Sequence, residues 1–286
     1  MNWHFRTVGM GTYNIRAAAR RIVNEAADTG LFQTSKGFSE KQIRLFMPTF
    51  WTEHKQILKA RIPGFGWYIW KPYFIHEMLN SIPEGDGLLY LDSGCTISKS
   101  KESFDQIADF LKIAEKYGIV GSNSDAYTEQ NYTSEDLMTR YKLTSEQRIS
   151  NQYCAAILFV VNDLAGREFT NEWRQMVCSD NHKWVLPQSY SLPNNSQFIH
   201  HMYDQAILSC LLKYHQKPSV ITGTKETLGA IRLSRHRYGY SLDNHSLTTK
   251  MCFDFLGKIS KIYLAVQRRI FWRSRNLRPK SHKDLR

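Results

Sequence analysis

The chain has 286 residues, of which 42% are hydrophobic and 13% aromatic, and it carries a formal net charge of +12. These values are typical of a globular protein with a sizeable core, and they exclude disorder of the whole chain. The five cysteines are odd in number and scattered, which argues against a disulfide scaffold and against the close cysteine pairs of a zinc module. The N-terminus lacks the apolar core of a signal peptide, and the longest apolar run, residues 154–161, is too short to cross a bilayer. We therefore expect a cytoplasmic protein with reduced, mostly buried thiols.

The first predicted elements are a strand and a helix joined by a glycine-containing loop. Residues 4–8 are typical of a strand, and apolar positions between residues 15 and 26 repeat with helical spacing before Gly30. Gly9 and Gly11 lie between them, directly after the first strand, which is a usual position for nucleotide contacts. These glycines permit close approach of the backbone to a ligand, but they equally suit an ordinary tight turn.

A second predicted strand ends at an acid. Residues 87–91 form an apolar run that stops at Asp92, which places this carboxylate at a strand end, where α/β enzymes keep their chemistry. Upstream, Trp70 and Lys71 precede Pro72 at the predicted start of a helix. An indole for stacking and a cation for phosphate suit a binding wall. The alternative is an aromatic cluster that fills the core beneath the sheet.

Strands and helices continue to alternate in the rest of the chain, which predicts an α/β sheet with helices on its faces. Ser100 is expected to cap a helix that ends before Gly118, and strand-like runs follow at 118–122, 155–161 and 219–222. Residues 122–150 and 179–196 are polar and are expected to form surface loops or lids. A helix over residues 203–213 would carry Asp204 in its first turn, where a carboxylate meets the helix dipole favourably.

Four segments together resemble the bacterial glycosyltransferases that build capsules and O-antigens from nucleotide sugars. They are GFGWYIWKPY at 64–73, DGLLYLDSGC at 86–95, QYCAA at 152–156 and HMYDQAIL at 201–208. The resemblance implies a GT-A fold, in which a Rossmann-like mixed sheet is flanked by helices, for a catalytic domain over residues 1–250. It also implies a reaction centre that contains Asp204 and Gln205, together with Asp92. Asp204 would act as a general base in an inverting reaction or would stabilise an oxocarbenium-like state in a retaining one.

The resemblance extends to residues that contact the nucleotide-sugar donor. Gln152 and Ala155 would border the donor sugar. The other expected donor-binding residues are Gly9, Gly11, Trp70, Lys71, Ser93, Gly94, Arg235 and Arg237.

A divalent metal is the point at which the sequence departs from that family. Many of its members hold Mn²⁺ or Mg²⁺ with an Asp-x-Asp triplet, whereas this chain has Asp92-Ser93-Gly94 and lacks the second acid. Asp92 would bind a metal with help from a late histidine, His236 or His245, or would bind ribose hydroxyls without any metal. In the second case Lys71 and the two arginines near residue 236 would neutralise the diphosphate.

The C-terminal segment, residues 251–286, forms a basic amphipathic tail with ten Lys or Arg against two Asp. One helical face carries the apolar side chains, and lysines and arginines lie to the other side. Such a helix suits the surface of an anionic membrane, but it also suits a terminal helix docked on its own domain. The apolar positions are Phe255, Ile259, Ile262, Tyr263, Val266 and Ile270, and the basic ones are Lys258, Lys261, Arg268 and Arg269.

The resemblance implies a hexosyltransferase, and UDP-galactose is the expected donor of the hexose. Its acceptor would be a lipid-linked O-antigen or capsular polysaccharide at the inner face of the cytoplasmic membrane, where the tail would hold the enzyme. One alternative is a non-catalytic polysaccharide-assembly partner with a degenerate site, in keeping with the missing second acid. The other is a basic nucleic-acid-binding protein, although no nucleic-acid-binding motif accompanies the charge.

Overall fold

A computed structural model of the chain describes residues 1–59, 63–185, 190–220, 222–224, 229–234, 239 and 247–273. Its centre is a mixed sheet with the strand order β2-β1-β3-β7-β5-β6, to which β8 adds beside β5. β1, β2 and β3 are parallel, and β7 is antiparallel to both β3 and β5. The predicted α/β class with a mixed sheet is therefore confirmed. The strands are β1 (Trp3–Gly9), β2 (Thr34–Ser39), β3 (Gly87–Leu91), β5 (Ile119–Thr128), β6 (Asn151–Tyr153), β7 (Ile157–Val161) and β8 (Ser219–Val220).

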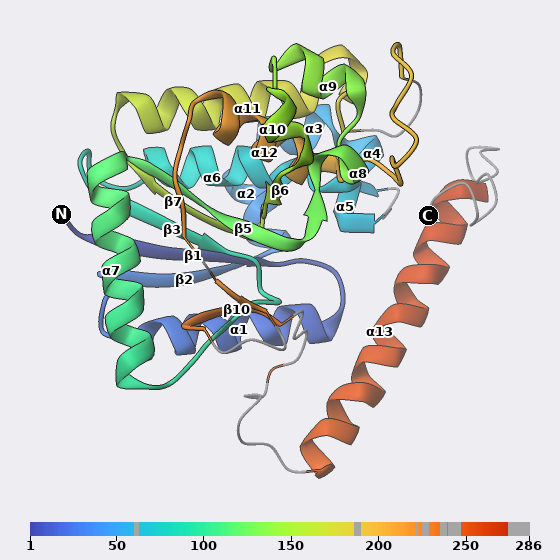
Figure 1. Cartoon of the computed structure of the whole chain (residues 1–286). Helices are drawn as coiled ribbons and strands as arrows, with labels where there is room; N and C mark the ends of the chain where they lie inside the picture. The colour runs from blue at the N-terminus through green and yellow to red at the C-terminus, as the bar shows by residue number, and fades with distance from the viewer. Residues whose placement is uncertain are drawn as a thin grey trace.

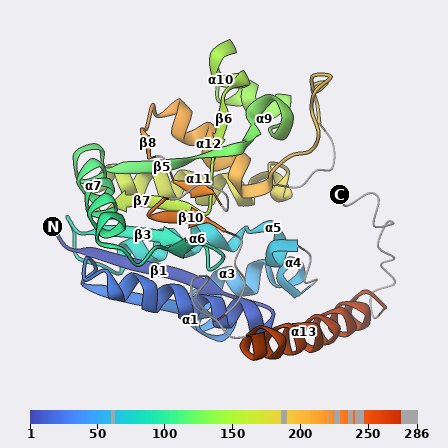
Figure 2. The ribbon, with the colours of Figure 1, turned by 60° about the horizontal axis from the view of Figure 1, so that its bottom comes forward.

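Helices cover both faces of this sheet (Figures 1 and 2). Side chains alternate along each strand, so Leu88 and Tyr90 of β3 enter one core while Leu89 and Leu91 enter the other. The second core is closed by α1 (Tyr13–Asp28) and α7 (Lys101–Tyr117). The first is closed by α2 (Glu40–Phe46), α3 (Pro48–Glu53), α6 (Trp70–Asn80), α11 (Leu164–His182) and α12 (Tyr203–Tyr214).

Local sequence signals set both ends of α7 as predicted, and a cap that was not predicted begins α1. Thr12 caps α1 by accepting a hydrogen bond from the N–H of Ile15, and Ser100 caps α7 by accepting one from Ser103. Gly118 ends α7 with a φ of 74°, in the left-handed region that favours glycine.

The polar segment 122–150 is not a surface loop, and that prediction is wrong. β5 runs on to Thr128 and three short helices follow: α8 (Glu129–Tyr132), α9 (Glu135–Arg140) and α10 (Ser145–Ile149). Polar side chains stabilise this segment in place of apolar ones. Thr144 and Gln147 form a capping box at α10, and the fully buried carboxylate of Glu129 accepts a hydrogen bond from the Lys213 ammonium at 2.8 Å.

Smaller elements complete the part of the chain that is described. α4 (Lys55–Lys59) and α5 (Pro63–Trp67) lead into α6. A second sheet joins β4 (Thr96–Ile97), β10 (Ile231–Leu233) and β9 (Gly223–Thr224) in the order β4-β10-β9. All five cysteines are free thiols, and Cys95, Cys154 and Cys210 are buried.

The predicted C-terminal helix is α13 (Leu247–Arg273), which begins four residues before the expected boundary at residue 251 and projects from the body (Figures 1 and 2). It contacts the start of α1, where the rings of Phe253 and Tyr13 lie 5.8 Å apart. The Tyr13 N–H donates to the Ser260 hydroxyl at 3.2 Å, and Gly257 packs against Asn14. Among the described helices, none is long and apolar enough to cross a membrane.

Candidate active site

The candidate site lies where the strand order changes direction. β2 lies on one side of β1 and β3 on the other, and the three strands are parallel. The loops after β1 and β3 therefore leave the same edge of the sheet, at the position where open α/β sheets bind ligands. β7 is antiparallel to β3, so its first residues reach this edge too, and the Asp92 N–H donates to the Ala156 carbonyl at 2.8 Å.

Three charged side chains from separate elements meet at this edge. The Nζ atom of Lys71, on α6, lies 3.2 Å from Oδ1 of Asp92 and 3.3 Å from Oδ2 of Asp204, on α12. Lys71 also donates to the carbonyl of Ala155 at 3.2 Å. Lys71 is 2% exposed and Asp204 3%, whereas the side chain of Asp92 is 33% exposed. Three of the expected site residues, Lys71, Asp92 and Asp204, thus form one cluster. Asp92 is the member of this cluster that is exposed to solvent.

Alternation along β3 explains how Asp92 joins this cluster. Asp92 follows Leu91 and faces the same side of the sheet as Tyr90. The Tyr90 hydroxyl donates to Oδ1 of Asp92 at 2.7 Å, and Tyr90 itself is fully buried. One carboxylate oxygen of Asp92 is therefore held by both a phenol and an ammonium group.

Burial sets the protonation of the cluster. Burial raises the pKa of Asp204 to about 6, because the ion pair with Lys71 offsets only part of the desolvation and the charge of Asp92 adds to the rise. Burial by itself lowers the pKa of Lys71, but the carboxylates of Asp204 and Asp92 outweigh it and raise that pKa above its usual range.

One oxygen of Asp204 is left without a hydrogen bond. Oδ2 is within ion-pair distance of Lys71, yet among the described residues it accepts no hydrogen bond. This oxygen is buried, and its described partner is the Lys71 ammonium at 3.3 Å.

A buried pair on α1 fixes the loop that carries Asp92. Arg21 donates to the carbonyls of Ser93 and Cys95 at 3.0 and 2.9 Å, and to both oxygens of Glu25 at 2.7 and 2.8 Å. Glu25 in turn accepts from the N–H of Ile97 at 2.9 Å. Charge-assisted hydrogen bonds of this kind hold the loop rigidly against the helix. The sequence analysis did not find this pair, although positions 21 and 25 lie on the buried stripe of the predicted helix.

The turn before α6 packs the aromatic residues of the second motif. Gly64, Phe65 and Gly66 have positive φ values of 67°, 55° and 91°. The indole N–H of Trp70 donates to the carbonyl of Gly64 at 3.0 Å, and Trp70 is 6% exposed. The ring of Tyr68 lies 4.9 Å from the Lys71 ammonium. Trp70 is thus buried and stabilises the turn through this hydrogen bond, which agrees with the alternative interpretation of Trp70 as a core aromatic residue.

The two glycines of the first loop have different surroundings. A Cβ on Gly9 would stand 2.7 Å from the Cβ of Ala19, so this glycine permits α1 to pack on the strand. Gly11 has a φ of 97°, and a Cβ there would stand 2.7 Å from Cε2 of Phe65. Gly11 therefore lets the first loop approach the turn before α6.

Gln205 and Gln152 belong to a buried polar chain. Gln205 donates to Oε1 of Gln152 at 2.8 Å, and Gln152 donates to the Thr133 hydroxyl at 2.7 Å. Both Thr133 and Ser209 donate hydrogen bonds to Glu129. This chain orients Gln205 beside Asp204. The acid of this chain, Glu129, lies in residues 122–150, whose polar composition predicts a surface loop. The buried chain was therefore not expected.

His201 anchors the start of α12. Its Nδ1 accepts from the N–H of Ser134 at 3.2 Å, and its Nε2 donates to the carbonyl of Trp184 at 2.9 Å. Burial lowers the pKa of His201 to about 4, which agrees with a neutral ring that accepts at one nitrogen and donates at the other. Tyr203 follows with a φ of 46°, so the chain bends sharply just before Asp204.

The remaining predicted residues lie along the Asp92 loop or outside the described residues. Ser93 is 8% exposed, and the carbonyl of Gly94 accepts from the Ser234 hydroxyl at 3.0 Å. Outside the described residues are Arg235, His236, Arg237 and His245.

The described residues do not fit a divalent metal at Asp92. Mn²⁺ and Mg²⁺ require several oxygen ligands, and the two carboxylates that meet here, those of Asp92 and Asp204, are both paired with the ammonium of Lys71. The position next to Asp92 that a cation would take is thus filled by a side chain.

No family model matches the sequence, and no curated protein matches it. The structure is similar to that of mouse xyloside xylosyltransferase 1 in its apo form, with 9% identity and a TM-score of 0.44 over 84% of this chain and 100% of that chain. It is also similar to a glycosyltransferase involved in glycosylation of the major capsid of PBCV-1, with 10% identity and a TM-score of 0.44 over 92% and 100% of the two chains. For the galactosyltransferase LgtC, in complex with donor and acceptor sugar analogues, the identity is 12% and the TM-score 0.38 over 90% and 95%. Identities and scores at this level assign no family, so the function proposed below rests on the residues of the site.

Proposed function

We propose that this chain is a glycosyltransferase that moves a hexose from a nucleotide sugar to a lipid-linked O-antigen or capsular polysaccharide acceptor. Galactose from UDP-galactose is the first donor to test. The observation that carries the proposal is the meeting of Asp92, Lys71 and Asp204 at the carboxyl ends of β1 and β3. This position suits a nucleotide, because a crevice at such a switch point is where parallel α/β sheets hold nucleotides.

Asp92 is the proposed contact for donor hydroxyls. Its carboxylate is the exposed member of the cluster and accepts hydrogen bonds, as ribose and hexose hydroxyls require. Lys71 is paired with both Asp92 and Asp204, so its proposed role is to hold these two acids in a fixed relation. Arg21 is a further positioning residue, since it fixes the backbone on either side of Gly94.

The proposed reaction assigns Asp204 to the sugar. The bond from the anomeric carbon to the phosphate oxygen breaks, and its electron pair leaves with the nucleoside diphosphate. A bond to the acceptor oxygen forms, and the acceptor proton passes to a base. With a pKa of about 6, Asp204 suits that base in an inverting reaction. In a retaining reaction, it would stabilise the positive charge that develops on the sugar.

We propose that arginines, rather than a metal on Asp92, neutralise the leaving diphosphate. Asp92 is already paired with Lys71, which supports this assignment. Arg235 and Arg237 follow in the sequence directly after Ser234, whose hydroxyl bonds to the Asp92 loop at Gly94. Arginine is well suited to bind phosphate oxygens in a bidentate manner.

The test is release of nucleoside diphosphate from a panel of nucleotide sugars, with Mn²⁺ or with a chelator. We expect one donor to be hydrolysed slowly without acceptor, with equal rates in both conditions. Asp92→Asn and Asp204→Asn should each reduce release at least tenfold, whereas Asp109→Asn, an exposed acid on α7, should not. Absence of both release and nucleotide binding across the panel would overturn the proposal and favour a non-catalytic assembly role.

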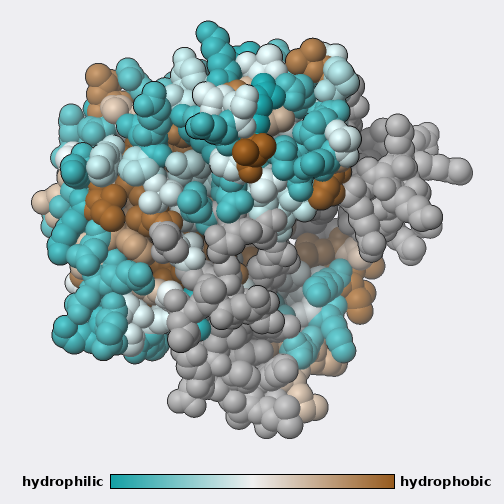
Figure 3. Space-filling view, in the orientation of Figure 1, coloured by the Kyte–Doolittle hydropathy of each residue, from teal (hydrophilic) through white to brown (hydrophobic). Residues whose placement is uncertain are grey.

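We further propose that α13 holds the enzyme on the anionic inner face of the cytoplasmic membrane. α13 contacts α1 through Phe253 and Ser260, whereas Phe255 and Ile262 on the same helix are 64% and 65% exposed. Figure 3 shows hydrophobic and hydrophilic surface side by side along this helix. Lys258 supplies an exposed cation on the same helix. This combination supports binding in the headgroup region of anionic lipids.

Sedimentation with anionic vesicles tests this anchor. We expect Phe255→Ser/Ile262→Ser to abolish binding, and added salt to weaken binding of the unaltered protein. Leu45→Ser/Leu164→Ser removes two exposed side chains elsewhere, which are 73% and 65% exposed, and should leave sedimentation unchanged. Equal sedimentation of both double variants would show that α13 is not the anchor.

A further inference from the structure

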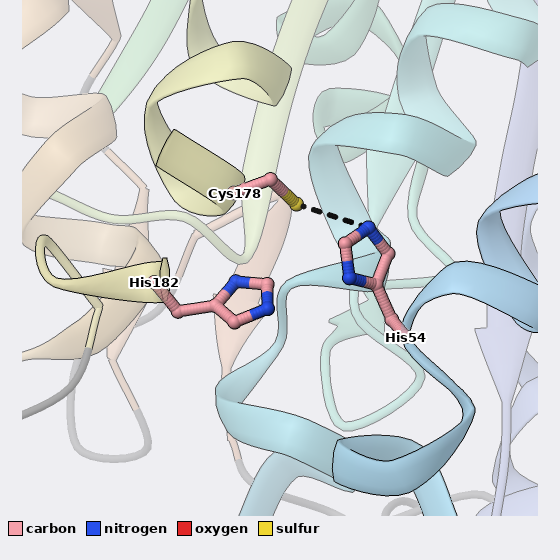
Figure 4. A group of neighbouring side chains, drawn as sticks. All are labelled: His54, Cys178 and His182. Atoms are coloured by element: carbon pink, nitrogen blue, oxygen red, sulfur yellow. Dashed lines mark hydrogen bonds between the residues drawn. The ribbon is translucent and has the colours of Figure 1, made fainter. Parts of the chain in front are cut away.

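A second group of side chains, which shares no residue with the Asp92 cluster, has the composition of a transition-metal site. His54 lies between α3 and α4, and Cys178 and His182 lie one turn apart at the end of α11. One ligand atom from each residue lies within 4.8 Å of the other two. Nε2 of His54 is 3.5 Å from Sγ of Cys178. Figure 4 shows the thiol and the His182 ring directed toward the ring of His54.

We propose that His54, Cys178 and His182 bind a zinc ion. In a tetrahedral site with Zn–S of about 2.3 Å and Zn–N of about 2.0 Å, the nitrogen and sulfur ligands stand about 3.5 Å apart. The distance between His54 and Cys178 already has this value. The rings of His54 and His182 lie 5.0 Å apart between centroids, and the ligand atoms of the three residues lie within 4.8 Å of one another.

The hydrogen bonds of the two histidines leave nitrogen atoms for a metal. Nδ1 of His182 lies 2.9 Å from the carbonyl of Val177, to which it donates, and this leaves Nε2 as the ligand atom. A backbone carbonyl that fixes the tautomer in this way is the usual outer partner of a metal-bound histidine. His54 is packed against the rings of Phe50 and Tyr73, with centroids 4.8 and 5.9 Å away. This packing orients the imidazole before any metal arrives.

The ligand types select zinc rather than the hard cations of sugar-nucleotide chemistry. One thiolate and two imidazoles suit a borderline ion such as Zn²⁺, whereas Mg²⁺ and Mn²⁺ prefer oxygen ligands. Glu53 is the candidate for the fourth position, because its Oε2 is 3.9 Å from Nε2 of His54 and its side chain is 58% exposed. The thiolate and this carboxylate together would neutralise the two charges of the ion.

A zinc ion here would join two parts of the fold that are distant in sequence. His54 belongs to the run of short helices that leads into α6, and the other two ligands belong to α11. α6 packs along α11 and carries Lys71. The ion would therefore stabilise the packing of α6, which carries Lys71, against α11, and it would take no part in the chemistry of the candidate active site.

Cobalt titration of untagged, full-length protein tests the proposal. A thiolate ligand gives Co²⁺ an intense sulfur-to-metal charge-transfer band in the near ultraviolet, and tetrahedral coordination gives visible bands. We expect both with one equivalent of Co²⁺, and their loss when Zn²⁺ is added. Cys178→Ser should abolish the ultraviolet band, and His54→Gln and His182→Gln should each weaken Zn²⁺ binding at least tenfold.

Matched variants separate the site from adventitious binding. Cys252→Ser removes an exposed thiol on α13, and His215→Gln removes a histidine paired with Glu172; neither should alter the cobalt spectrum. Zn²⁺ should raise the melting temperature of the unaltered protein but not that of Cys178→Ser. The proposal is overturned if the unaltered protein gives no charge-transfer band, if the band survives Cys178→Ser, or if Cu²⁺ binds where neither Co²⁺ nor Zn²⁺ does. Each readout is independent of glycosyl transfer.

Discussion

Replacement of Lys71 by methionine is the change that tests the candidate active site most directly. Methionine keeps much of the length of the side chain and removes the charge that joins Asp92 to Asp204. The variant leaves two carboxylates at one strand edge with no cation among the described residues to pair them. We therefore expect it to destabilise the fold and to raise the pKa of Asp204 further.

The distances give the size of the effect. At 3.2 and 3.3 Å, and with an effective dielectric constant of about 20, each ion pair of Lys71 has a Coulomb energy of about 5 kcal/mol. Desolvation of the ammonium offsets part of this gain, and removal of one partner from a buried pair costs about 3 to 5 kcal/mol. Asp204 is 3% exposed and carries most of that cost, whereas Asp92 is relieved by solvent. We expect Lys71→Met to lower the free energy of unfolding by about 3 kcal/mol at neutral pH.

Urea unfolding, followed by tryptophan fluorescence, measures this loss. The difference from the unaltered protein should shrink as the pH falls below about 6, because Asp204 then becomes neutral. The double variant Lys71→Met/Asp204→Asn should be more stable than the sum of the two single changes predicts. Lys112→Met removes an exposed ion pair with Asp109 and should unfold like the unaltered protein. If Lys71→Met also unfolded like the unaltered protein, the reasoning from buried charge would be refuted.

Three further predictions concern the same edge of the sheet. Arg21→Met should lower the free energy of unfolding by about 3 kcal/mol in the same urea assay, because Glu25 is left buried without its cation; an unchanged midpoint would contradict the role given to the pair. Gly11→Ala should lower the free energy of unfolding by about 1 to 3 kcal/mol more than Gly85→Ala does, because both glycines have positive φ but only Gly11 lies against the ring of Phe65. Equal melting temperatures of the two variants would refute the close contact. Donor turnover should fall as the pH drops through about 6, where Asp204 gains its proton. Since that pKa lies above the ordinary 3.8, the stability contribution of Asp204 grows over the same fall in pH, and pH profiles of rate and urea midpoint measure the two trends.

The positions of Asp92 and Asp204 within their own elements could be predicted from the sequence. The abrupt end of an apolar run placed Asp92 correctly after β3, and helical spacing placed Asp204 in the first turn of α12. Both signals are local, since each depends on hydrophobic periodicity within one element. What periodicity does not provide is the contact between elements, so the ion pairs of Lys71 with both acids appear only in the fold.

The burial of polar residues whose partners are distant in the sequence could not be predicted. Glu129 is fully buried in a segment whose composition predicts a surface loop, because Lys213 and Gln152, far away in the chain, satisfy its carboxylate. The three ligand candidates around His54 were missed for a related reason, as only two of them share a helix. Cysteine spacing identifies zinc modules with paired cysteines, and it gives no signal for a site with a single one.

The pairing of Lys71 also gives a physical reason for the missing second acid in Asp92-Ser93-Gly94. Two acids at a strand end need a divalent cation to balance them, but here the second acid, Asp204, comes from α12 and the balancing cation comes from α6. The carbonyls of Ser93 and Cys95 accept hydrogen bonds from Arg21. The carbonyl of Gly94, which lies between them in the sequence, accepts a hydrogen bond from the Ser234 hydroxyl. We therefore predict that the Lys71 ammonium balances the two acids without a divalent ion, so that turnover is retained in a chelator.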